Sequence, residues 1–188
     1  MKKNRVVLYL IYLITTIGLI GLDQYSKILA IDHLKDKNSI AILKDIFELS
    51  YVENKGAAYG MLAGKINLFL IITFILVPAI IYSIHKISNI IEFFGEKVNA
   101  KVFKLLQIDL VIILAGAIGN FIDRVTKGYV VDYFYFKLID FPVFNVADCY
   151  ITVAVVILLF ICIFKLKDKE LDYLMGSKKK WQVEDESK

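Results

Sequence analysis

The chain of 188 residues has little of what marks several familiar protein classes. Its two cysteines, Cys149 and Cys162, lie in one apolar stretch, too far apart along a single helix to bond to each other, which excludes a disulfide framework. Only two prolines and ten glycines are present, which excludes a collagen-like or disordered chain. The net charge is only +4 and the lysines form short separate clusters, so we expect no nucleic-acid partner.

Charged residues are also scarce, whereas apolar residues are abundant. Hydrophobic residues make up 58% of the chain and charged residues 22%, with a mean hydropathy of +0.63. Soluble domains are closer to half apolar. Four stretches, 6–22, 66–84, 105–122 and 149–164, are long enough as helices to cross a hydrocarbon layer about 30 Å thick. We predict an all-α membrane bundle of four transmembrane helices, with residues 1–165 as one membrane-embedded domain and 166–188 as a charged cytoplasmic tail that is frayed or disordered.

The distribution of basic residues predicts the orientation of this bundle. The N-terminus, the segment 85–104 and the tail hold 14 lysines and arginines, against 9 in the two remaining connections. Because basic residues favour the cytoplasmic side, we expect both termini to be cytoplasmic. The segments 32–65 and 124–147 are then extracytoplasmic.

These two extracytoplasmic segments differ in pattern. Phe47, Leu49 and Tyr51 alternate with polar residues, which predicts a half-buried strand, and the residues 54–56 predict a turn. The second segment combines an aromatic run, 133–136, with Pro142, so we expect it to be short and to lie on the membrane surface.

Acidic residues next to apolar sequence need an explanation, because an ionisable group at membrane depth costs a few kcal/mol or more. Asp23 and Lys27 have the i, i+4 spacing of a local ion pair, and a purely structural role is the simpler interpretation. Asp109 is expected near the cytoplasmic interface, where its side chain can reach water. His33 and His85 have no second ligand at metal spacing, so we expect no metal site.

A polar stripe is predicted on the third helix. At helical spacing it contains Gly116, Asn120, Asp123 and Arg124, with Gly116 leaving room for a neighbouring backbone. The stripe fits either a functional site or helix packing with one interfacial charge.

Asp132 and Asp148 remain, each without a basic residue within four positions. If the fold brings their carboxyls together, both cannot ionise easily, and the pair holds one shared proton near neutral pH. One carboxylate could then activate water while its protonated partner polarises a scissile carbonyl. Asn145 could cap the fourth helix, and an Asp at a helix start is, taken alone, more often only a capping residue.

Five motifs in order resemble those of the bacterial lipoprotein signal peptidases (signal peptidase II), which are integral-membrane aspartyl proteases. They are DQYSK at 23–27, NKGAA at 54–58, GAIGNFIDR at 116–124, VVD at 130–132 and FNVAD at 144–148. Each motif alone is weak, but five in order are specific.

The resemblance implies four transmembrane helices, a small β-rich extracytoplasmic cradle and a catalytic pair at Asp132 and Asp148. It implies cleavage of prolipoproteins immediately before a diacylglyceryl-modified cysteine at the outer face of the bacterial cytoplasmic membrane, with membrane lipid around the enzyme and no metal or organic cofactor. We expect a monomer. Matching of motif positions gives supporting or substrate-binding roles to Asp23, Lys27, Asn54, Gly56, Gly116, Asn120, Asp123, Arg124, Asn145 and Ala147.

Two other classes of function stay open on the sequence. A small proton-coupled transporter would use intramembrane acids as a relay, and would favour acids spread through the bilayer and a repeat between halves. A non-catalytic membrane adaptor would use the polar stripe only to pack helices, and would tolerate Asp148→Asn.

Overall fold

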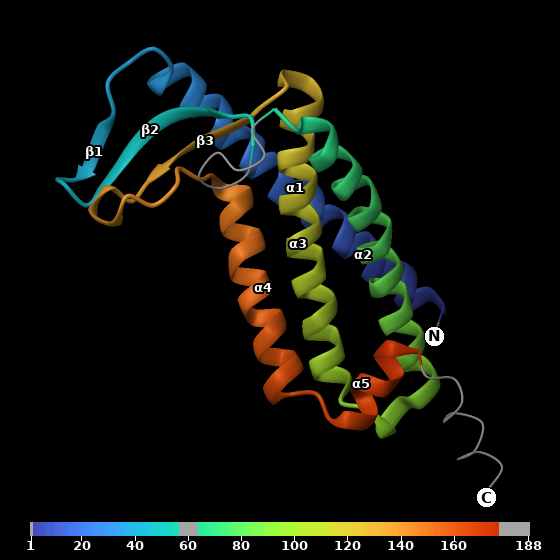
Figure 1. The fold of residues 1–188 in the computed structure, drawn as a ribbon. Coiled ribbons are helices and arrows are strands. Elements are labelled where there is room, and N and C mark those ends of the chain that lie inside the picture. Colours follow the sequence, from blue (N-terminus) through green and yellow to red (C-terminus); the bar gives the residue numbers. More distant parts are fainter. Residues whose placement is uncertain (1, 57–63, 177–188) are drawn as a thin grey trace, which may run out of the picture.

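The computed structural model describes residues 2–56 and 64–176. Four helices are long and apolar enough to cross a membrane: α1 (Lys2–Leu34), α2 (Ile66–Phe94), α3 (Ala100–Lys127) and α4 (Val146–Phe164). They form an elongated bundle with a small sheet at one end (Figure 1). The predicted four-helix membrane fold is therefore confirmed.

All four helices extend beyond the apolar stretches seen in the sequence. The extension of α1 runs to Leu34 and includes Asp23 and Lys27, both fully buried. These charged residues can be buried because they pair with each other, while Lys27 also contacts Asp123 and Asn120 on α3 and Asp23 accepts from the N–H of Ala147 on α4. The length of an apolar stretch alone therefore underestimates the length of the helix that contains it.

A three-stranded antiparallel sheet, in the order β1-β2-β3, covers one end of the bundle. Its strands are β1 (Ile40–Leu43), β2 (Phe47–Asn54) and β3 (Val130–Tyr135). The strand predicted from residues 47–51 is confirmed as part of β2. The second extracytoplasmic segment, for which no strand was predicted, supplies β3, because Val130 and Val131 are buried and pair with Asn54 and Glu53 of β2.

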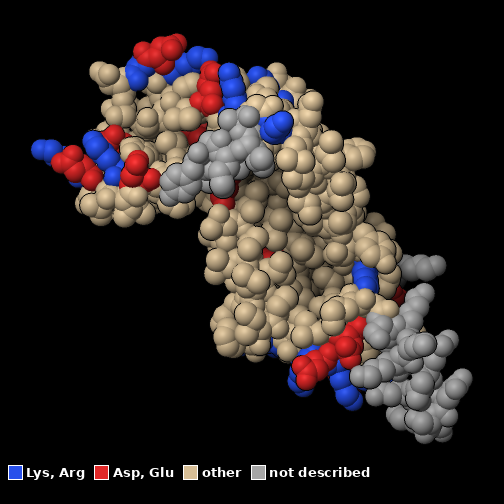
Figure 2. Space-filling model, viewed as in Figure 1, with Lys and Arg blue, Asp and Glu red and all other residues tan. Residues whose placement is uncertain are grey.

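Charged side chains gather at the two ends of the molecule, and the belt between them is largely uncharged (Figure 2). Helix α3 lies in the middle of the bundle and packs against α1, α2 and α4. This distribution is the one expected for a protein whose middle section is surrounded by hydrocarbon.

Asp109 on α3 does not lie where the sequence analysis placed it. Its residue is only 2% exposed, and neither carboxylate oxygen has a hydrogen-bond partner among the described residues. The side chain points into the helix packing and does not reach the interface.

The beginning of the tail is ordered, contrary to the expectation of a frayed segment. Helix α5 (Asp168–Met175) folds back at the end of the bundle opposite the sheet (Figure 1). Tyr173 stacks on Phe94 of α2, and the buried Glu170 accepts a hydrogen bond of 2.7 Å from the backbone N–H of Asn99. These contacts hold the chain through residue 176, and the remaining predicted tail, 177–188, lies outside the described residues.

Candidate active site

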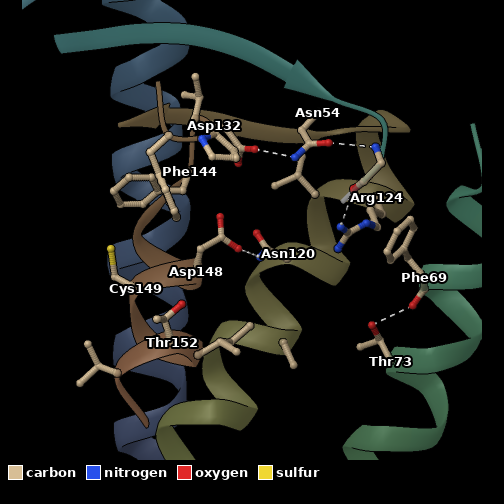
Figure 3. A pocket seen from close by; sticks show the side chains of 18 of the residues that line it. Asn54, Phe69, Thr73, Asn120, Arg124, Asp132, Phe144, Asp148, Cys149 and Thr152 are labelled. Carbon is tan, nitrogen blue, oxygen red and sulfur yellow. Dashed lines mark hydrogen bonds between the residues drawn. The ribbon is translucent and has the colours of Figure 1, made fainter. Parts of the chain in front are cut away.

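Asp132 and Asp148 line the same cavity at the junction of the sheet and the bundle. Asp132 lies on β3, and Asp148 lies in the first turn of α4 (Figure 3). The cavity has a volume of about 610 Å³, and Asn54, Asn120 and Arg124 line it as well. The two acids that the sequence left without a local partner are thus brought together by the fold.

Amide groups contact every carboxylate oxygen of this pair. The side-chain Nδ2 of Asn54 donates to Asp132 Oδ2 at 2.8 Å, and that of Asn145 donates to Asp132 Oδ1 at 2.7 Å. Asn120 Nδ2 donates to Asp148 Oδ1 at 2.8 Å, and the backbone N–H of Asn145 donates to Asp148 Oδ2 at 3.1 Å. Four hydrogen bonds therefore fix the orientation of both carboxyl groups.

Asn145 connects the two acids. Its side-chain oxygen accepts from the backbone N–H of Asp148 at 3.0 Å, which completes a capping box at the start of α4. The predicted cap is confirmed. The same side chain donates to Asp132, so Asn145 both starts the helix that carries Asp148 and orients Asp132.

The environment of Asp132 favours its protonated form. The residue is 1% exposed. Burial raises the pKa of Asp132 to about 7, the neighbouring Asp148 adds to this rise, and the hydrogen bonds from Asn54 and Asn145 oppose it. A carboxyl group with a pKa near neutrality can exchange a proton during a reaction.

The buried ammonium group of Lys27 holds several side chains of the site in place. Lys27 Nζ contacts Asp23 Oδ2 at 2.9 Å, Asp123 Oδ2 at 3.1 Å and Asn120 Oδ1 at 2.9 Å. The predicted Asp23–Lys27 ion pair is confirmed, and it is part of a larger cluster that joins α1 to α3. Because an ammonium has three donors, all of them are used. Asn120 is thereby held between Lys27 and Asp148.

Asp23 and Asp123 also hold backbone groups near the catalytic candidates. Asp23 Oδ1 accepts from the N–H of Ala147 at 3.0 Å, one residue before Asp148. Asp123 Oδ2 accepts from the N–H of Val131 at 3.1 Å, one residue before Asp132. Each carboxylate of the Lys27 cluster therefore fixes the backbone next to one member of the pair.

Two glycines allow the helices to approach this closely. A Cβ atom at Gly116 would lie 2.7 Å from the carbonyl oxygen of Ala147, and one at Gly119 would lie 2.5 Å from Asp23 Oδ2. The room predicted at Gly116 is confirmed. Gly119, which the sequence analysis did not select, is needed for the contact between α1 and α3.

Arg124 lies on the opposite wall of the cavity from Asp132 and Asp148. Its guanidinium lies over the Phe69 ring at 4.7 Å, and Nη2 lies 3.5 Å from the carbonyl oxygen of Gly56 (Figure 3). Gly56 N–H in turn donates to Asn54 Oδ1 at 2.9 Å, which confirms the turn predicted there. Ala57 and Ala58 of the same motif lie outside the described residues.

Two further residues, Lys127 and Phe69, contribute to the site and were not predicted from the sequence. Lys127 donates to Asp123 at 2.6 Å, and its i, i+4 spacing could have revealed it. Phe69 is apolar and distant in sequence from Arg124, so their contact could not be predicted from the sequence. Within residues 2–56 and 64–176, His, Cys, Asp and Glu side chains form no group arranged to hold a metal ion.

The family model and the curated proteins that match this chain all belong to one family. The family model described as "Signal peptidase (SPase) II" matches residues 15–164. The lipoprotein signal peptidase of Clostridioides difficile is 38% identical over 157 residues, covering 84% of this chain and 95% of that protein. The lipoprotein signal peptidase of Caldanaerobacter subterraneus is 45% identical over 145 residues, covering 77% and 90%.

A solved structure supports the same relationship. It is described as "Bacterial membrane enzyme structure by the in meso method at 2.3 A resolution" and has a TM-score of 0.65 at 30% identity, covering 84% of this chain and 92% of its own. The matched residues contain all five sequence motifs, together with α2, α3, α4 and the part of α1 from residue 15 onward. The chain belongs to the signal peptidase II family and is a multi-pass bacterial membrane peptidase.

Proposed function

We propose that this enzyme cleaves prolipoproteins immediately before a diacylglyceryl-modified cysteine, and that Asp132 and Asp148 activate the attacking water. The observation that carries the proposal is the placement of these two carboxyl groups in one cavity, each held by two amide donors. Family membership gives the class of substrate, and the pair gives the chemistry.

The two carboxyls have different environments, which suggests different roles. Asp148 lies in the first turn of α4, where the helix dipole favours its ionised form. Burial and the nearby Asp148 favour the protonated form of Asp132. We assign Asp148 as the base toward water and Asp132 as the acid toward the scissile carbonyl oxygen.

The reaction then proceeds with a balanced set of proton transfers. Asp148 takes a proton from water as the water oxygen bonds to the carbonyl carbon, and Asp132 gives its proton to the carbonyl oxygen. In the second step the carbon–nitrogen bond breaks, the proton on Asp148 passes to the leaving nitrogen, and Asp132 recovers a proton from the tetrahedral intermediate. The products are the carboxyl end of the signal peptide and the amino group of the modified cysteine.

Apolar side chains from three membrane helices continue the cavity away from the acids. Phe69 and Leu76 come from α2, Ala117 from α3, and Ile151 and Val153 from α4. This lining suits a signal helix and acyl chains that enter from the bilayer. Arg124 and Asn54 are placed to hold the substrate backbone and Asp132, respectively.

The remaining predicted residues have positioning roles in this proposal. Lys27, Asp23, Asp123, Asn120 and Asn145 hold the acids and their backbone in place. Gly116 and Ala147 provide the close approach of α3 and α4, and Gly56 anchors the turn beside Asn54.

We also propose an orientation and a simple assembly. The start of α1 and helix α5 lie at the end opposite the sheet (Figure 1), which fits cytoplasmic termini and an active site at the outer face. One chain supplies every residue of the described site, in keeping with a monomer surrounded by membrane lipid.

A cleavage assay with two forms of one substrate tests this proposal. The purified enzyme in detergent micelles is given a prolipoprotein with a diacylglyceryl-modified cysteine, and in parallel the same precursor without the modification. We expect a gel shift only for the modified form, with mass spectrometry placing the new N-terminus at the cysteine. Equal cleavage of both forms, or a cut at another bond, would contradict the proposed specificity.

A further inference from the structure

A second cavity lies far from the active site, between the sheet-distal parts of α1, α2 and α3. Its volume is about 430 Å³, and the residues that define its character are Arg5, Leu8, Ile91, Glu92 and Lys104. Lys104 precedes Asn120 by 16 positions on α3, a distance of about 24 Å along a helix. The cavity is therefore separate from the peptidase site.

Among the described residues, the charged side chains that line this cavity leave one cation, Lys104, unpaired. Arg5 forms an ion pair of 2.9 Å with Glu92 and donates to Asn89 at 2.7 Å, so the charge of Glu92 is already balanced. Lys104 is exposed and has no hydrogen bond or ion pair with any residue in the described part of the chain. The cavity thus presents a net positive charge to a ligand.

The other residues that line the cavity are apolar or have polar groups that are already hydrogen-bonded within the protein. Leu8 and Ile91 contribute hydrocarbon surface. Gln107, which also lines the cavity, is fully buried; it donates to Ser88 at 2.7 Å and accepts from Tyr12 at 3.2 Å. Its polar atoms are used inside the protein, so Lys104 is the group left to bind a charged ligand.

We propose that this cavity binds an anionic phospholipid of the surrounding membrane. Lys104 donates to the lipid phosphate, the paired Arg5 lies beside it, and an acyl chain lies along Leu8 and Ile91. Basic pockets between transmembrane helices at a membrane interface are suited to such headgroups. The combination of a free cation with apolar neighbours matches a ligand that carries both a negative charge and hydrocarbon.

Lipid titration of the full-length protein in dodecyl maltoside tests this site. Dioleoylphosphatidylglycerol, dioleoylphosphatidylcholine and inorganic phosphate are added separately, and bound species are counted by native mass spectrometry. We expect the phosphatidylglycerol to bind about fivefold more tightly than the phosphatidylcholine, the effect of one lysine near the membrane surface. Lys104→Ala should remove this preference, and Glu92→Gln, which frees Arg5, should increase it.

Lys101→Ala is the matched control, because Lys101 is an exposed lysine on the same helix that does not line the cavity. It should retain the preference for phosphatidylglycerol. Equal binding of the two lipids by the wild type, or equal losses in Lys101→Ala and Lys104→Ala, would overturn the proposal. Inorganic phosphate that displaces the lipid at equal concentration would also overturn it, because the site would then bind small anions without hydrocarbon.

Discussion

Asn145 donates a hydrogen bond of 2.7 Å to Asp132, and it caps the helix that carries Asp148. A single side chain thus determines the position of one carboxyl and the start of the element that positions the other. Asn145 thus links β3 to α4. The relative position of Asp132 and Asp148 therefore depends on the capping of α4.

The pH dependence of turnover should follow the proton on Asp132. Because burial raises the pKa of Asp132 to about 7, the acid is protonated below that pH and loses its proton above it. If Asp132 is the acid of the reaction, kcat should fall as pH rises through about 7, approaching a tenfold drop per pH unit above it.

Steady-state kinetics on a lipidated precursor between pH 5.5 and 9 measures this fall in kcat. Thermal unfolding recorded at each pH is the control. A kcat that rises through pH 7 would instead indicate that Asp132 works as the base.

Gly119→Ala should disrupt the site from a position outside it. The added Cβ would lie 2.5 Å from Asp23 Oδ2, and Asp23 holds the backbone N–H of Ala147 beside Asp148. We expect a loss of about 1–3 kcal/mol in stability from this overpacking, together with a clear loss of cleavage.

The matched control is Gly21→Ala on α1, where a Cβ would meet nothing within 4 Å. It should keep cleavage close to wild type and should not lower thermal stability, because alanine favours a helix by about 1 kcal/mol over glycine. Equal losses in the two variants would show that the close contact at Gly119 does not determine the result.

Replacing Lys27 should cost far more than replacing Lys127, although both contact Asp123. The side chain of Lys27 is 1% exposed, and its removal leaves the buried Asp23 without an ammonium and Asp123 with Lys127 alone. Lys27→Met should therefore destabilise the protein by about 3–5 kcal/mol.

The side chain of Lys127 is 26% exposed, so Lys127→Met should cost about 1 kcal/mol or less. Thermal unfolding in detergent compares the two variants. Equal losses would mean that the buried cluster contributes no more than a surface ion pair.

Asp109→Ala should stabilise the protein. The carboxyl of Asp109 is buried with no hydrogen-bond partner in the described part of the chain, and such burial costs about 1–3 kcal/mol. The variant should unfold at a higher temperature than the wild type, with unchanged cleavage. A lower unfolding temperature would show that this carboxyl makes a stabilising contact.

Much of this structure could be predicted from local sequence patterns. The four apolar stretches, the Asn145 cap and the Asp23–Lys27 spacing are all properties of residues that lie close together in the chain. Interactions between residues close in the chain determine these features, so they can be predicted from a single sequence.

Other features depend on contacts between distant segments and could not be predicted in that way. The residues of β3 do not alternate between buried and exposed positions, so no two-residue period marked the strand, and its strand state comes from pairing with β2. The burial of Asp109 and the bond from Lys27 to Asp123 depend equally on how the helices pack.

The most direct test of the account is the cleavage rate of Asp132→Asn and Asp148→Asn on a lipidated prolipoprotein. Asp140→Asn is the control, since Asp140 is an exposed residue that bonds only Tyr135 among the described side chains. With folding verified by thermal unfolding, the account predicts that each variant of the pair loses about 10²–10⁴-fold in kcat while Asp140→Asn keeps the wild-type rate. Near-wild-type cleavage by either Asp132→Asn or Asp148→Asn would contradict the catalytic pair.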